Sequence, residues 1–278
     1  MINPLDYFAT LVQQDDAIPL FEAALAIAQD ANPQLDLCTV QAEIDQLVLK
    51  LKRRLPSDVS TVQKLKLLNH YFYRELGFAG NVNDYYSADN SYLNYVVSTR
   101  RGIPISLAVV YMELAHQIGL QVKGICFPGH FLMKLSVQSG EIILDPFSGE
   151  SLSREAIEHR LEPYLQSQSR ASSGMLAAVL EPASAREILV RMLRNLKSLF
   201  EERQQWDQLL CVQERLIILL PEDTIERRDR GLVYAELGCP RLALQDLEAY
   251  LAMHPYAEDR QELSELMIAL REAIDRLN

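Results

Sequence analysis

The chain contains few cysteines. Cys38, Cys126, Cys211 and Cys239 are widely spaced among 278 residues, and no two of them form a Cys-x-x-Cys motif. Disulfide-stabilised secreted domains and structural zinc sites need denser or more regular cysteine spacing. The pattern favours a reduced chain, and we expect a cytoplasmic protein.

The sequence also has no long hydrophobic run. Its longest apolar stretch, residues 103–112, is interrupted by Pro104 and Ser106. It is shorter than the roughly 18 residues that a membrane helix needs. The first residues carry no basic cluster ahead of an apolar stretch, so we expect no signal peptide and no membrane partner.

Basic residues are outnumbered. The chain has 27 Lys and Arg residues and 38 Asp and Glu residues, which gives a formal net charge of -11. Binding along a phosphate backbone requires clustered Lys and Arg, so the charge argues against a nucleic-acid partner. His130, Cys126 and His116 do not form a convincing ligand set, and we expect neither a metal nor another cofactor.

Length and periodicity indicate an α+β protein with an all-helical C-terminal domain. We interpret residues 1–55 as an N-terminal helical segment, residues 56–170 as the α+β core and residues 184–278 as helical repeats. After Gly119 the hydrophobic period changes from 3.6 to 2. The core should therefore hold a small antiparallel sheet, with strands at residues 120–127, 130–137 and 141–147.

The C-terminal domain carries an internal repeat. Pro221 and Pro255 each end a helix that follows a hairpin. The spacing between these two prolines is the tetratricopeptide repeat length of about 34 residues. The first hairpin is less regular, because Trp206 stands where the second has Pro240. We expect residues 257–278 to form a capping helix.

His130 and Asp145 are the main candidates for chemistry. If the hairpin turns near Ser139, residue 132 pairs with 145 and residue 130 with 147, so both side chains lie at the end away from the turn. A carboxylate that holds one imidazole nitrogen fixes the tautomer and leaves the other nitrogen free to act as a base.

Such a pair needs a nucleophile, which is best activated at a helix N-terminus. A helix is expected to open at Pro104, but no cysteine lies there. Ser106, the nearest hydroxyl, either attacks with the help of His130 or caps its own helix. Cys126 is either a small buried thiol or a thiol beside the site. We favour the structural alternative for both.

Residues ahead of this helix are expected to line a cleft. Asn94, Arg101 and Pro104 should lie where the helix start meets the His130–Asp145 end of the hairpin. Arg101 either binds a carboxylate or phosphate at the helix start or pairs with a surface acid. We favour the pairing with an acid.

The order of these features resembles the transglutaminase-like superfamily. More narrowly, four segments resemble the bacterial SirB-type group of transglutaminase-like proteins with tetratricopeptide repeats: residues 90–120, 128–134 (PGHFLMK), 143–150 (ILDPFSGE) and 227–238 (RRDRGLVYAELG). The resemblance implies a papain/transglutaminase-like core and a repeat tail. Pro104 stands at the position of that superfamily's cysteine, so thiol catalysis does not carry over. His130 and Asp145 carry over by position only.

Two functions follow from these observations. The first is a non-catalytic binding or scaffold protein, a pseudoenzyme that acts through a vestigial cleft and a repeat groove for a protein or peptide partner. The second is a hydrolase or acyl transferase that uses Ser106 or Cys126 with His130 and Asp145. The distances among these four side chains separate the two hypotheses.

Overall fold

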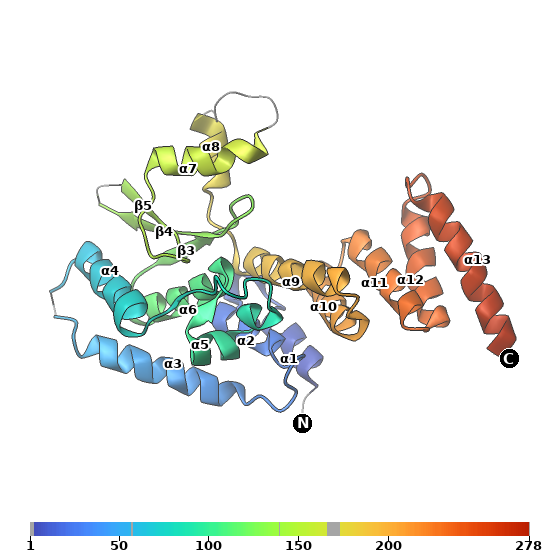
Figure 1. Ribbon diagram of the computed structural model, residues 1–278, viewed down its shortest axis with the longest axis horizontal. Coiled ribbons are helices and arrows are strands. Elements are labelled where there is room, and N and C mark those ends of the chain that lie inside the picture. Colours follow the sequence, from blue (N-terminus) through green and yellow to red (C-terminus); the bar gives the residue numbers. More distant parts are fainter. Residues whose placement is uncertain (1–2, 57, 139, 166–172, 278) are drawn as a thin grey trace. The chain divides into compact units, whose positions relative to one another are not determined.

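A computed structural model shows the fold (Figure 1). It describes residues 3–56, 58–138, 140–165 and 173–277. Residues 11–192 form one compact unit, and residues 1–10 together with 193–278 form another. We call them the α+β unit and the repeat unit. The helices expected between residues 11 and 55 belong to the α+β unit, together with the expected core. The boundary expected at residue 170 lies outside the described residues.

Four helices open the chain, and two of them begin at side-chain caps. They are α1 (Pro4–Leu11), α2 (Leu20–Ile27), α3 (Leu37–Lys52) and α4 (Thr61–Asn69), with the turn η1 (Asp15–Ala17) after the first. The Asp36 side chain accepts the Cys38 N–H at the start of α3, and Ser60 and Gln63 cap α4 reciprocally. A π-helical turn, η2 (His70–Glu75), then extends α4, which the hydrophobic pattern does not indicate.

Helix α6 (Pro104–Gln117) lies in the core of the α+β unit, and every residue from Pro104 to Met112 is buried. Pro104 takes the first helical position, where its missing N–H has no cost. Gly119 follows the helix at φ 75°, the left-handed conformation that ends helices. Ahead of α6 lie η3 (Ala88–Ser91), α5 (Leu93–Thr99) and a parallel strand pair, β1 (Ala79–Gly80) with β2 (Arg101–Gly102).

Three strands form the antiparallel sheet that the sequence predicts. They are β3 (Val122–Ile125), β4 (Leu132–Val137) and β5 (Gly140–Leu144), in the order β3-β4-β5. Val137 pairs with Gly140, and Met133 pairs with Leu144. This is the register expected from a turn near Ser139, a residue that itself lies outside the described part of the chain.

The two faces of the sheet pack against different helices (Figure 1). One face packs on α7 (Arg154–Leu161) and α8 (Ser173–Val179) through a cluster of buried residues: Ile125, Phe127, Leu132, Ile143, Ile157, Leu161 and Leu176. A short turn, η4 (Glu162–Tyr164), follows α7. Side chains alternate along a strand, so Met133 and Leu144 face the other side, where α6 contacts β3 and β4.

The repeat unit confirms the spacing seen in the sequence. Helices α10 (Trp206–Leu219) and α12 (Pro240–Met253) begin and end exactly one repeat length apart, the offset that separates Pro221 from Pro255. Helices α9 (Ala185–Glu202) and α11 (Thr224–Glu236) end at the same offset. Both hairpins turn through a left-handed residue, Gln204 at φ 53° in the first and Gly238 at φ 67° in the second. The backbone thus repeats although the residue types differ.

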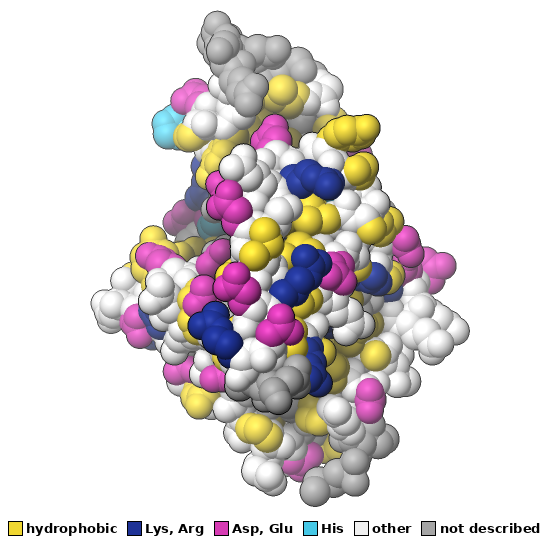
Figure 2. All heavy atoms as spheres, turned by 90° about the vertical axis from the view of Figure 1, so that its right-hand side faces the viewer, with side chains coloured by type: hydrophobic (Ala, Val, Ile, Leu, Met, Phe, Trp, Pro, Cys, Tyr) yellow, Lys and Arg dark blue, Asp and Glu magenta, His cyan; other side chains and the backbone are white. Residues whose placement is uncertain are grey.

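Helix α13 (Arg260–Leu277) packs against α12 as the expected cap. Its residues Leu263, Met267 and Leu270 join Leu247 and Tyr250 in one buried cluster. The exposed residues of α13 are mostly polar or charged, as is typical of a terminal repeat that faces water. Figure 2 shows one face of the molecule, on which basic, acidic and hydrophobic side chains lie beside one another.

No helix within the described ranges has the length and hydropathy needed to cross a bilayer. Nor do the described residues include any group of three or more His, Cys, Asp or Glu side chains that could hold a metal ion.

Candidate functional site

His130 and Asp145 form a hydrogen-bonded pair at the end of the β4–β5 hairpin away from its turn. His130 Nε2 lies 3.1 Å from Asp145 Oδ1, the proximity that the hairpin register predicts. The Asp145 side chain is 6% exposed and that of His130 is 22% exposed. Because Nε2 faces the carboxylate, Nδ1 is the nitrogen left for another partner. In the described part of the chain Nδ1 makes no hydrogen bond.

Two further donors hold the Asp145 carboxylate. Its Oδ1 accepts the Phe147 N–H at 2.8 Å, and its Oδ2 accepts from Arg160 Nη1 at 2.8 Å. Burial alone would raise the pKa of Asp145. The bonds to His130, Phe147 and Arg160 outweigh burial and lower this pKa to about 2. The carboxylate is therefore ionised at neutral pH and shared between an imidazole and a guanidinium.

This sharing weakens the case for a catalytic base. In a catalytic triad the carboxylate stabilises the imidazolium that forms during reaction. The guanidinium of Arg160, on α7, is permanently charged and lies 2.8 Å from the same carboxylate. It offsets part of the negative field that His130 would otherwise experience. The arrangement favours an ion pair that joins α7 to the hairpin end.

Two tyrosines fix the backbone on either side of the pair. A Cβ atom at Gly129 would lie 1.6 Å from the Tyr164 hydroxyl oxygen, and Gly129 has φ 65°, so glycine is required beside His130. Tyr73 donates its hydroxyl to the Pro146 carbonyl at 3.1 Å. Burial, together with the nearby charge of Asp145, raises the pKa of Tyr73, which therefore stays a donor.

Ser106 is fully buried, and its hydroxyl bonds to backbone groups. Its Oγ accepts the Ile103 N–H at 3.1 Å and lies 2.5 Å from the Asn90 carbonyl oxygen and 3.0 Å from that of Ile103. The single hydroxyl proton is directed to a carbonyl, and Ser106 makes no hydrogen bond to His130 within the described residues. The geometry is that of the capping alternative, extended by a bond to Asn90.

Cys126 and His130 lie in the segment between β3 and β4 and have different surroundings. Gly124, two residues before Cys126, faces Ile188 of α9, and the Cys126 Sγ lies 4.0 Å from the Glu187 carbonyl oxygen. His130 instead bonds Asp145, whose other carboxylate oxygen accepts from Arg160 of α7. Cys126 is half-buried, so the expectation of a buried thiol holds only in part.

The environment of Cys126 also disfavours a thiolate. Burial raises the pKa of the thiol, although Arg191 acts in the opposite direction. An activated catalytic thiol requires a lowered pKa.

The residues expected to line a cleft have different environments. Pro104 is buried at the start of α6, and Asn94 is half-buried on α5, where its Oδ1 is buried and has no hydrogen-bond partner. Arg101 Nη1 donates to the carbonyls of Gly77 and Arg100, at 2.6 and 2.9 Å. The favoured pairing of Arg101 with an acid is therefore wrong. That a cleft exists between these residues stays a prediction.

Phe147 connects the hairpin end to the start of α6. A Cβ atom at Gly80 would lie 1.9 Å from the Phe147 ring, so the ring rests directly on the β1 backbone. Gly80 pairs with Gly102, which leads into Pro104. The two halves of the expected site thus approach each other, with an aromatic ring at their junction.

Sequence reasoning missed Arg160 and Asn90. Arg160 gives no local signal, because no strand pairing or repeat offset relates its position on α7 to that of Asp145. Asn90 opens the motif at residues 90–120, and a polar residue ahead of a helical segment is a signal that could have been used. Its 3% exposure shows that it belongs to the core of the unit.

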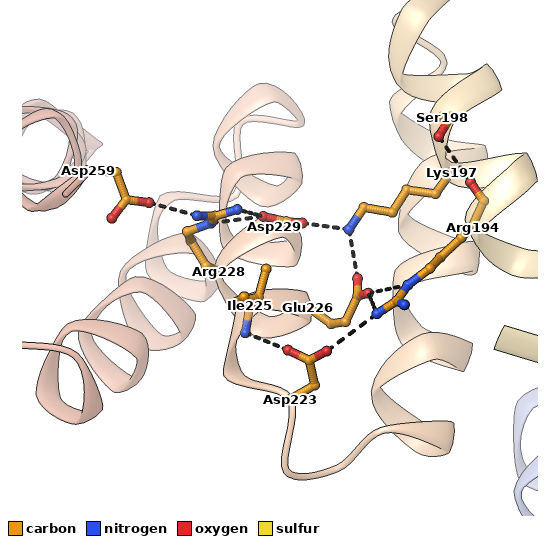
Figure 3. A network of polar contacts seen from close by, with 9 residues as sticks. All are labelled: Arg194, Lys197, Ser198, Asp223, Ile225, Glu226, Arg228, Asp229 and Asp259. Atoms are coloured by element: carbon orange, nitrogen blue, oxygen red, sulfur yellow. Dashed lines mark hydrogen bonds and ion pairs between the residues drawn. The ribbon is translucent and has the colours of Figure 1, made fainter. Parts of the chain in front are cut away.

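The repeat unit has its own network of buried charges (Figure 3). Glu226 of α11 is 2% exposed and accepts from Arg194 at 3.1 Å and from Lys197 at 2.7 Å, both on α9. Lys197 also bonds Asp229. Burial would lower the pKa of Lys197, but Asp229 and Glu226 reverse that effect and raise it. The network holds α11 against α9.

A shallow groove lies between α12 and α13. Its volume is about 430 Å³, and its lining combines apolar and charged side chains: Glu248, Leu251, Ala252, Arg260, Ser264, Met267, Ile268 and Arg271. Arg271 pairs with Glu248 at 2.8 Å, whereas Arg260 bonds the Pro255 carbonyl. The groove therefore offers apolar contacts and one cation without a carboxylate partner among the described residues.

Comparison with known families decides the assignment. A model of the transglutaminase-like superfamily matches residues 38–194, more than half of the chain. The chain belongs to the transglutaminase-like superfamily. A tetratricopeptide repeat model matches residues 196–268. Together these two parts fit a scaffold or interaction role.

Bacterial relatives place the chain in the SirB-type group of this superfamily. A UPF0162 protein of Xylella fastidiosa is 39% identical over 246 residues, which cover 87% of this chain and 86% of that protein. The UPF0162 protein YchA of Escherichia coli is 30% identical over 85% of this chain and 87% of its own length. Protein SirB1 of Salmonella typhimurium is 31% identical over 78% of this chain and 79% of its own. No solved structure gives a significant match.

Proposed function

We propose that this member of the transglutaminase-like superfamily is a non-catalytic scaffold of the bacterial cytoplasm that binds a protein or peptide partner. The observation that carries the proposal is the state of Ser106, the hydroxyl nearest the helix start. It is fully buried, and its hydroxyl bonds to backbone groups. A side chain in that state cannot attack a substrate without breaking the start of α6.

The rest of the site supports the same proposal. The Asp145 carboxylate is divided between His130 and Arg160, and the Cys126 thiol has a raised pKa and lies against the Glu187 carbonyl. Removing the nucleophile while keeping the fold leaves a surface that can bind but cannot form a covalent intermediate.

Covalent labelling tests the absence of catalysis. The full chain is treated with iodoacetamide and with a fluorophosphonate, and modified residues are located by peptide mass spectrometry. Exposed Cys38 serves as the internal reference and should react faster than Cys126. Replacement His130→Ala should change neither rate, and Ser106 should stay unmodified.

The alternative function is a hydrolase or acyl transferase, and the observation in its favour is the hydrogen-bonded His130–Asp145 pair. Labelling of Ser106 or Cys126 that disappears in His130→Ala would establish this alternative and refute the scaffold proposal.

The groove between α12 and α13 is where we propose that the partner binds, because it combines apolar and charged contacts. Immobilised full chain is compared with Ile268→Glu, a change in the groove lining, and with Ile225→Glu, a change on α11. The two isoleucines are similarly exposed, at 56% and 49%. Proteins captured from a bacterial lysate should be lost with Ile268→Glu and kept with Ile225→Glu. Equal capture by both variants would exclude the groove.

A further inference from the structure

The groove between α12 and α13 has an equivalent one repeat earlier, where the chain itself supplies the helix that covers it. Ser264 of α13 lies one repeat length after Arg230 of α11, and Ile268 lies one repeat length after Tyr234. Arg230 pairs with Asp246 of α12 at 2.7 Å. Tyr234 packs against the buried cluster to which α12 contributes. This row of α11 is therefore covered by α12.

The equivalent row on α13 has no helix packed over it within the described residues. Ile268 is 56% exposed, and Ser264 is half-buried. Both line the groove, together with Leu251 and Ala252 of α12. The small side chains of Ala252 and Ser264 leave space between two helices, the kind of gap that a side chain of a third helix fills.

Glu265 determines where such a helix can lie. One repeat earlier, Gly231 lets Leu247 of α12 approach α11 closely, since a Cβ atom there would meet that leucine at 3.0 Å. Glu265 stands at the position of Gly231 and is exposed. It prevents an equally close approach on its own side of α13. An occupant therefore lies over the groove, against α12 and the row of Ser264 and Ile268.

Charge in the groove favours an acidic residue on the occupant. Arg271 is neutralised by Glu248 at 2.8 Å, whereas Arg260 bonds a backbone carbonyl and has no carboxylate partner in the described part of the chain. Arg260 lies one turn before Ser264 on the same row of α13. In the inner hairpin, the cation of this row is Arg230, and α12 supplies its carboxylate.

Helix α12 also shows the orientation and spacing of the occupant. It runs antiparallel to α11, because Asp246 meets Arg230 and Tyr250, one turn later, meets Arg228. Its buried apolar positions follow the spacing i, i+4 and i+7: Ala243, Leu247 and Tyr250. A helix laid over the groove in the same direction brings its i+7 position close to Arg260.

We propose that the groove binds an amphipathic helix of a partner protein that presents two apolar residues and one acidic residue at positions i, i+4 and i+7. The helix runs antiparallel to α13. Its apolar residues enter between Ala252 and Ser264 and cover Ile268, and its carboxylate pairs with Arg260. This inference rests on the proposed binding function and defines the chemistry of its partner.

A defined helical peptide tests the proposal. The probe is an acetylated and amidated helix of alanine and glutamine that carries Leu, Leu and Glu at i, i+4 and i+7. It is added to the isotope-labelled full chain and followed by amide NMR shifts, which should be confined to α12 and α13. Gln in place of the peptide's Glu should weaken binding by about two- to five-fold, the range of an exposed ion pair.

Changes in the chain locate the contact. Arg260→Gln should weaken binding of the Glu peptide as much as the peptide's own change to Gln, and the two changes together should cost no more than either alone. Ala252→Leu fills the groove from an exposed position and should weaken binding by about five-fold or more. Arg276 is the matched control, an exposed arginine of α13 outside the groove lining, and Arg276→Gln should leave the affinity unchanged.

Several outcomes would overturn the proposal. Equal weakening by Arg260→Gln and Arg276→Gln would show general attraction to basic residues. Lysate capture that is lost with Ile268→Glu, while the peptide does not shift the groove, would refute the helical acidic partner and leave the groove as a binding site. A concentration-dependent dimer that Ala252→Leu abolishes would assign the groove to a second copy of the chain.

Discussion

Two buried polar networks, one in each unit of the molecule, use different kinds of bond. In the α+β unit, Ser106 and Asn90 are neutral and bond mainly to backbone groups. In the repeat unit, Glu226 and Lys197 are charged and bond each other across two helices. Bonds from side chain to backbone fix the path of one segment, whereas bonds between charges select which helices pack together. Bonds to the backbone therefore determine local loop conformation, and bonds between charged side chains determine helix packing in the repeats.

The two helical hairpins show the same contrast at equivalent positions. Gly231 packs against Leu247 in the second hairpin, where a Cβ atom would meet the leucine at 3.0 Å. The residues one repeat earlier are Lys197 and Gln213. With its amide turned to satisfy both neighbours, the Gln213 oxygen lies 3.2 Å from Lys197 and its nitrogen 3.0 Å from Glu226. The apolar contact between Gly231 and Leu247 in the second hairpin thus corresponds to a polar contact between Lys197 and Gln213 in the first.

The largest expected effect is at the charged network. Glu226→Ala removes the carboxylate and leaves Lys197 poorly solvated, so the free energy of unfolding should fall by about 3–5 kcal/mol. Denaturant titration of the full chain measures the change. Glu248→Ala removes an exposed ion pair and should cost no more than about 1 kcal/mol. If both variants lost the same free energy of unfolding, burial of the ion pair would not determine its contribution to stability.

The neutral network should give the next largest effect. Ser106→Ala leaves the Ile103 N–H and the Asn90 carbonyl without their partner, and we expect a loss of about 2–4 kcal/mol. Ser153 is the matched control, because it caps α7 at an exposed position and its replacement by Ala should cost about 1 kcal/mol. Denaturant unfolding compares the two variants. If they lose the same stability, Ser106 acts only as a cap.

Asp145 combines both kinds of bond and should make stability depend on pH. Its folded-state pKa of about 2 lies below the ordinary value of 3.8, so ionisation favours the folded chain. This contribution, about 2 kcal/mol, should be complete above about pH 4 and be lost as pH falls toward 2. Urea unfolding of the native chain and of Asp145→Asn should therefore converge in stability on acidification. A stability difference between the two proteins that stays constant with pH would contradict the lowered pKa of Asp145.

The smallest expected effect concerns the turns of the two hairpins. Gln204 adopts φ 53° where the second hairpin has Gly238 at φ 67°. A non-glycine residue is strained in this conformation, so Gln204→Gly should stabilise the chain by about 0.5–1 kcal/mol. Gly238→Ala should destabilise it by about 1–2 kcal/mol. Thermal unfolding measures both changes. If the two turns are equivalent, the stability changes of the two variants must have opposite signs.

The sequence predicts those features that depend on a local period. Alternation with a period of 2 and a turn near residue 139 determine the pairing of the hairpin, and with it the proximity of His130 and Asp145. The repeat offset determines the equivalence of Trp206 and Pro240. In both cases the relevant residues are close in sequence or related by a fixed offset.

Features that depend on contacts outside strand pairing and repeat offsets could not be predicted. Arg160 reaches Asp145 from a separate helix, and Arg101 turns back to the Gly77 carbonyl, 24 residues earlier, in place of an acid. No periodic pattern encodes either contact.

The charged contact between α9 and α11 is not repeated one unit further along the array. A duplicated α11–α12 hairpin, added after residue 253, would bring its own copy of Glu226 to the positions one repeat beyond Arg194 and Lys197. Those positions hold Arg228, which already binds Asp229 and Asp259, and Gly231, which carries no charge. The copied carboxylate would lack the lysine that it needs. The charged contact that joins α9 to α11 is therefore specific to these two helices.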